Sequence, residues 1–217
     1  MYVTTLLRVS AFALVGLLCA TAVAAQNPVH NHIGHAATGF NGTPEGQGLL
    51  STAIAEAAVA ARHAGLAARD PSDLDGAKRH MGHVIHALDP SVVESGPGLG
   101  YGVKQGAEGA ARHVELAAGT DGASQNVTTH SNHVITDARN AAANVDAAIA
   151  LAQRIQASND YVLAEPLIEQ LAALTEAIAS GTDANDDGRI GWQAPEGGLA
   201  QSDQHLTLLQ RGEGLIN

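Results

Sequence analysis

Residues 60–85 read AARHAGLAARDPSDLDGAKRHMGHVI, and residues 110–135 read AARHVELAAGTDGASQNVTTHSNHVI. Aligned without a gap at an offset of fifty, the two stretches share eleven of their twenty-six residues. Unrelated stretches of this composition would share only about two or three. Each stretch holds an alanine-rich segment, a polar break and a second segment with helical spacing. The duplication therefore predicts two copies of one helical hairpin, which we expect to pack as a four-helix bundle.

The composition of the chain also favours helices. Aromatic residues make up only 3% of the chain, and an alanine-rich, aromatic-poor sequence suits closely packed helices better than sheets. We expect helices at about 48–69, 72–89, 103–118, 124–157, 161–180 and 198–211, with Ser72 as an N-cap. The predicted fold is all-α. A bundle occupies 48–157, a helix–loop–helix region occupies 158–217, and an irregular histidine-containing lead-in occupies 26–47.

The first twenty-five residues have the pattern of a cleaved signal peptide. Arg8 precedes an apolar run at 9–18, and small residues at 22–25 provide a cleavage site before Gln26. The apolar run is too short to favour a transmembrane anchor. Cleavage would also remove Cys19, so the mature chain would hold no disulfide and no thiolate metal site. We therefore predict a periplasmic or secreted protein.

The charge of the chain argues against nucleic acid as a partner. The formal net charge is −11, and it becomes −12 once Arg8 is removed with the signal peptide. No stripe of lysine and arginine is visible, and an acidic chain repels phosphate backbones.

Two histidines project from apolar helical stripes in equivalent positions of the repeat. His63 is flanked one turn away by Val59 and Leu66, and His113 by small or apolar residues. The second segment of each copy carries an HxxH pair, and this spacing puts both rings on neighbouring parts of one helix face. Each hairpin thus offers three imidazoles, from His63, His80 and His83 in one copy and from His113, His130 and His133 in the other.

Three imidazoles suit Zn(II) or Cu(II), with a position left for water or another ligand. The leading prediction is therefore transition-metal binding for storage, scavenging or transfer. If the hairpins face each other, the six rings could instead form one dinuclear centre, or His63 and His113 could ligate a non-covalent haem b for electron transfer. Packing histidines in a structural envelope protein are a further alternative. Enzymatic activity is not favoured, because no general base follows a motif near these residues.

The other histidines are left outside these sets. His30, His32 and His35 could add metal affinity or belong to a flexible polar tail. We expect His86 to be exposed, and His205 has no visible partner.

A short acidic segment near the C-terminus resembles the EF-hand calcium loop. Asp183, Asn185 and Asp187 stand at positions one, three and five, Gly188 stands at the turn, and the Arg189 carbonyl would be the seventh-position ligand. Position twelve is alanine where the family has glutamate, so either the loop is longer and Glu196, two residues later, closes the shell, or the loop binds calcium weakly. The resemblance covers about fourteen residues and implies a structural Ca²⁺ site.

Overall fold

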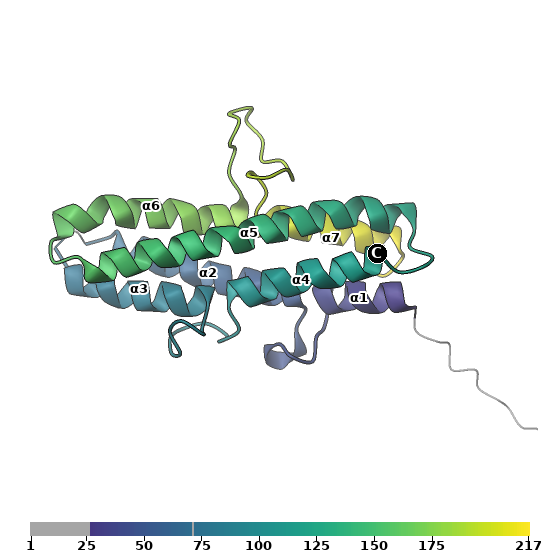
Figure 1. Ribbon diagram of the computed structural model, residues 1–217, viewed down its shortest axis with the longest axis horizontal. Helices are drawn as coiled ribbons and strands as arrows, with labels where there is room; N and C mark the ends of the chain where they lie inside the picture. Colours follow the sequence, from purple (N-terminus) through teal and green to yellow (C-terminus); the bar gives the residue numbers. More distant parts are fainter. Residues whose placement is uncertain (1–26, 71) are drawn as a thin grey trace, which may run out of the picture.

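The computed structural model describes residues 27–70 and 72–217 (Figure 1). The predicted signal peptide, including Cys19, lies outside the described residues. Within them the chain is helical, which confirms the all-α prediction. The elements are α1 (Pro28–Ala37), the 3₁₀ turn η1 (Pro44–Gly46), α2 (Leu49–Ala67), α3 (Leu74–Leu88), α4 (Val103–Ala118), α5 (Gln125–Ala157), α6 (Tyr161–Ser180) and α7 (Leu199–Gly212).

These helices form four rods, each made of one helix or of two helices in line, and neighbouring rods are antiparallel (Figure 1). The first rod is α1 followed by α2, the second is α3 followed by α4, the third is the unbroken α5, and the fourth is α6 followed by α7. Each rod packs against the next, and the fourth returns to pack on the first. The bundle therefore includes α1 and the C-terminal α6–α7 region as well as the duplicated hairpins.

Three rods are interrupted near their middles by loops that project from the bundle. The loops are residues 38–48, 89–102 and 181–198 (Figure 1). Glu56 of α2 is fully buried and ties the second loop to the bundle, because its Oε1 accepts the backbone N–H of Tyr101 at 2.8 Å and of Gly102 at 3.1 Å. These contacts satisfy free amides at the start of α4.

The lead-in is helical where the sequence analysis expected an irregular segment. Asn27 caps α1 by accepting the N–H of Val29 at 3.0 Å, and proline stands at the first helical position. Val29 and Ile33 are buried on one face. A cap, an N-terminal proline and apolar residues four apart are thus sufficient for this short helix once it packs on α4.

The remaining helix boundaries lie within two residues of those expected. The predicted N-cap of α3 is wrong by one residue, because the cap is Asp73 and not Ser72. The Asp73 carboxylate accepts the N–H of Gly76 at 2.7 Å. Between α2 and α4 the core is built largely from alanine, so these helices approach closely.

No helix among the described residues combines the length and the apolar character that crossing a bilayer requires.

Candidate metal centres

The described histidines gather into three triads of one design. Each triad combines an HxxH pair on one helix with a single histidine on the antiparallel neighbour, and each is half-buried. The three are site 1 (His32 and His35 of α1 with His113 of α4), site 2 (His80 and His83 of α3 with His63 of α2) and site 3 (His130 and His133 of α5 with His205 of α7).

In every triad the Nδ1 atoms of the three rings converge. At site 2, Nδ1 of His63 lies 3.0 Å from that of His80 and 3.3 Å from that of His83. At site 1 the distances from His113 are 3.1 and 3.3 Å, and at site 3 those from His205 are 3.1 and 3.2 Å. The ligand atoms of each triad all lie within 4.8 Å of one another. In all three triads, the nitrogen that each ring turns toward its neighbours is therefore Nδ1.

Hydrogen bonding alone does not account for this convergence. A ring nitrogen carries either one proton or one in-plane lone pair, so it can make only one good hydrogen bond. Nδ1 of His113 has two nitrogen neighbours at this range. Ligands held at about 2.0–2.1 Å from one metal ion in tetrahedral or octahedral geometry are roughly 2.9–3.4 Å apart. The observed spacings match that range.

The pairing of the rods determines which histidines meet. The triad histidines of the first and second rods face each other, and so do those of the third and fourth rods. The second copy of the hairpin begins one rod later than the first. Its histidines therefore face different rods from those that the equivalent histidines of the first copy face.

The arrangement of the rods explains why one of the two predicted sets of three histidines is present and the other is not. His63, His80 and His83 come together as expected. His113 does not join His130 and His133. It belongs to the second rod, so it faces α1. The six rings consequently form no common dinuclear centre, and His63 and His113 contact different partners, which disfavours the pair as haem ligands.

Three of the triad histidines lie outside the two sets predicted from the sequence. They are His32, His35 and His205. A signal for two of them was present, since His-Ile-Gly-His at 32–35 has the form of His-Met-Gly-His at 80–83. The offset there is forty-eight, so an ungapped comparison at fifty does not align the two. For His205 the sequence around it carries no such pattern, and only the packing of α7 on α5 reveals its partners.

Two histidines lie outside the triads. His86, expected to be exposed, is buried, and its Nδ1 lies 2.8 Å from the Val93 carbonyl oxygen, which anchors the loop 89–102. His30 is partly exposed, and its Nε2 lies 3.5 Å from a Glu213 carboxylate oxygen.

The surroundings of three triad histidines favour the neutral imidazole. Burial lowers the pKa of His63 and His113, and the neighbouring rings of each triad lower it further because charging one ring disfavours charging the next. For His205 the same causes lower the pKa to about 4. A neutral imidazole has a free lone pair, so the rings are ready to bind a metal at neutral pH.

The acidic loop 181–198 adopts tight turns built on its own side chains. The Asp183 carboxylate accepts the N–H groups of Asp187 and Gly188 at 3.1 and 2.8 Å, and Asn185 also accepts the N–H of Asp187 at 2.9 Å. Glu196 is buried and its Oε2 accepts the N–H of Gly191 at 2.8 Å. Among the described carboxylates, those of this loop do not form a group of three within ligand distance of one another.

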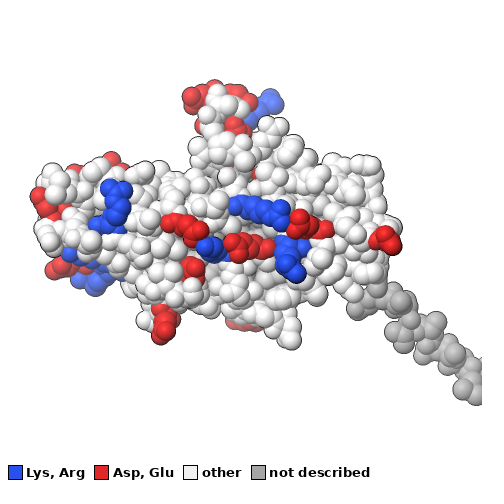
Figure 2. All heavy atoms as spheres, in the orientation of Figure 1, with Lys and Arg blue, Asp and Glu red and all other residues white. Residues whose placement is uncertain are grey.

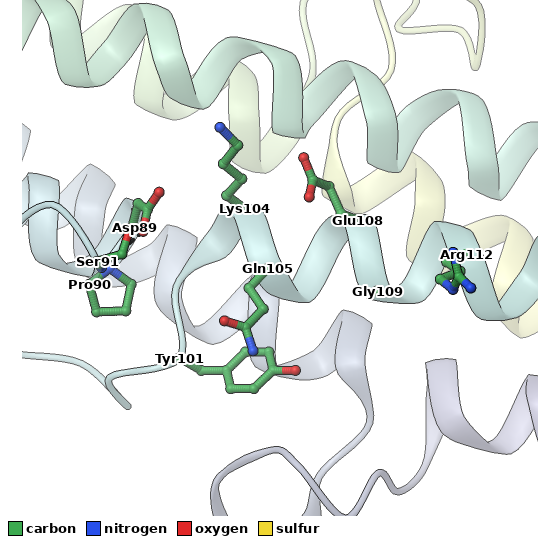
Figure 3. Close-up of a pocket in the computed structure, with 9 residues that line it drawn as sticks. All are labelled: Asp89, Pro90, Ser91, Tyr101, Lys104, Gln105, Glu108, Gly109 and Arg112. Atoms are coloured by element: carbon green, nitrogen blue, oxygen red, sulfur yellow. Dashed lines mark hydrogen bonds between the residues drawn. The ribbon is translucent and has the colours of Figure 1, made fainter.

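A surface cavity of about 450 Å³ with no histidine in its lining opens beside α4, and Lys104 and Glu108 on its wall point toward α5 (Figure 3). Lys104 pairs with Asp146 at 2.7 Å. On this face acidic and basic side chains alternate (Figure 2). Exposed pairs of this kind contribute little stability.

Comparison with known proteins adds no assignment, because no protein-family model, curated protein or solved structure matches the chain.

Proposed function

We propose that this protein binds three transition-metal ions, one at each histidine triad, and that it stores or carries them. The observation that supports this is the convergence of nine Nδ1 atoms in three triads of the same design. Three copies of one site on a small bundle suit the handling of ions as cargo. A catalytic site would be expected once, with a general base beside the metal, and the three ligand groups contain only histidine.

The spacing favours bare ions over haem. Two axial nitrogens on opposite sides of one iron would be about 4.0–4.2 Å apart, with the porphyrin between them. The Nδ1 pairs at 3.0–3.3 Å leave no space for a porphyrin. Neutral imidazole is a good ligand for Cu(II) and Zn(II), and Cu(II) binds such sites most tightly among the divalent ions of the first row. We therefore propose Cu(II) or Zn(II), and we place the protein outside the cytoplasm on the basis of the signal-peptide pattern at residues 1–25.

Metal stoichiometry tests the proposal. The purified protein should take up three equivalents of Cu(II) or Zn(II), measured by elemental analysis after removal of free metal, and should show no Soret band when expressed with haem. His63→Ala, His113→Ala and His205→Ala should each remove one equivalent, because each belongs to a different site.

His30→Ala is the matched control, since His30 belongs to no triad, and it should keep all three equivalents. The proposal would be abandoned if the wild-type protein took up no metal, or if the three single variants bound as much as the control.

We further propose that the loop 181–198 binds one Ca²⁺. The proposal is supported by the EF-hand-like spacing of Asp183, Asn185 and Asp187 and by the turn at Gly188, which has φ 83° and donates its N–H to Asp183. Calcium should raise the thermal midpoint by a few degrees in the wild type and not in Asp183→Ala. Asp186→Asn is the control, because asparagine tolerates the positive φ of 58° at that position. No calorimetric heat and no shift in the wild type would refute calcium binding.

A further inference from the structure

Two of the three histidine sites are covered by an aromatic side chain from a rod-interrupting loop. At site 1 the Phe40 ring lies 5.4 Å from the His35 ring and 5.3 Å from the His113 ring, measured between centroids. At site 3 the Trp192 ring stacks on His133 at 3.9 Å with an interplanar angle of 21°. Phe40 comes from the loop 38–48 and Trp192 from the loop 181–198.

Site 2 has no such cover among the described residues, where the only aromatic neighbours of its rings are one another. The loop 89–102, which interrupts the second rod, is held elsewhere by Glu56 and by His86. Site 2 lies instead near the short turn between α2 and α3. A crevice of about 70 Å³ beside His80 is lined there by Asp70, Asp73 and Arg79, and Arg79 pairs with Asp73 at 3.6 Å.

These surroundings should give the sites different exchange rates. Three imidazoles leave at least one coordination position open, and an incoming ligand or chelator must reach that position to remove the ion. An apolar ring packed on the ligands limits access of water and of competing ligands.

We propose that site 2 is the site of rapid metal uptake and release, and that Phe40 and Trp192 make sites 1 and 3 slow to exchange. This rests on the proposed metal binding at all three triads. The protein would then load and unload through His63, His80 and His83, and would retain two ions under conditions in which a competing ligand removes the third.

Release to a chromogenic chelator in a stopped-flow instrument tests the proposal on protein loaded with three equivalents of Zn(II). One equivalent should leave at least tenfold faster than the other two, and His63→Ala should remove the fast phase. Trp192→Ala should convert one slow equivalent to a fast one, and Phe40→Ala the other. Trp192→Phe, which keeps an aromatic ring, should remain slow.

Val162→Ala is a matched control, because Val162 is apolar, 73% exposed and outside all three sites. Phe40→Leu keeps apolar volume should Phe40→Ala fail to fold, and it should still speed release. Failure to load three equivalents would count against metal binding itself. Full loading with three equal rates, or a slow phase unchanged in Trp192→Ala and Phe40→Leu, would overturn the exchange proposal alone.

Discussion

The first and second rods together carry two histidine sites, whereas the third and fourth carry one. The chain holds no histidine between His133 and His205, so half of the second rod pair lacks a triad. That half is packed instead by large aliphatic side chains that are fully buried, including Ile155, Ile168 and Leu171. The bundle therefore closes without a histidine triad at this position.

The two rod pairs also differ in a buried carboxylate near the middle of the bundle. In the first pair, Glu56 accepts two backbone N–H groups through Oε1. In the second pair, Asp137 of α5 is fully buried beside Gly197, and neither of its oxygens has a hydrogen-bond partner. Burial raises the pKa of Asp137 to about 8. One carboxylate holds a loop in place, and the other is an unpaired polar group in the core.

The largest expected effect is the stabilisation of the two rod pairs by metal. Each site held at a free metal concentration a hundred times its Kd should add about 2.7 kcal/mol, so three sites add about 8 kcal/mol. For a chain of this size that corresponds to roughly 20 °C in Tm. The double variant His63→Ala/His113→Ala breaks both sites of the first rod pair and should keep about a third of the shift, measured by thermal unfolding with and without metal.

A variant of the second rod pair allows the metal-induced shift in Tm to be compared between the two rod pairs. His205→Ala removes only site 3 and should keep about two thirds of the shift. Without metal, both variants should unfold close to the wild-type temperature, because the aliphatic half of the bundle packs without a triad. A metal-free double variant that does not fold would show that the histidines are needed by the fold itself.

Replacing the two buried carboxylates should change the stability of the fold in opposite directions. Glu56→Ala leaves two amides at the start of α4 without an acceptor and should cost about 1–3 kcal/mol. Asp137→Asn removes an unpaired acid, so it should be close to neutral at pH 4 and increasingly stabilising as the pH rises toward 8. The sign follows because the folded chain keeps the Asp137 proton up to about pH 8 while the unfolded chain loses it near pH 4.

Urea unfolding at several pH values measures both effects. Stability from Asp137 is present at low pH and is lost as the pH rises toward 8, so the advantage of Asp137→Asn should grow over that range. An advantage independent of pH would mean that the carboxylate is ionised and solvated in the folded protein.

Much of the bundle could be predicted from the sequence, whereas the composition of the sites could not. Helix periodicity and turn residues locate α4 and α6 to the residue, because local propensity and capping decide where a helix begins and ends. The partner of His113 depends on which rod lies beside it, and this is a property of the whole bundle. The six histidines of the repeat in residues 60–135 all belong to triads, but only those of site 2 are grouped as the sequence predicts.

The smallest expected effect is the acid sensitivity of the metal-free protein, and it distinguishes site 3 from the rest. Histidines of the unfolded chain bind protons near pH 6.5, whereas burial and the neighbouring imidazoles lower the pKa of folded His205 to about 4. Between these values the unfolded chain binds a proton that the folded chain does not, so stability must fall as the pH falls from 6.5 to 4. His205→Gln should reduce this loss, measured by urea midpoints at pH 7.0 and 4.5 with a chelator present, while His30→Gln should leave it unchanged. Equal losses in the wild type and in His205→Gln would mean that the His205 ring is readily charged and that site 3 is open to solvent, which would also weaken the case for Trp192 as its cover.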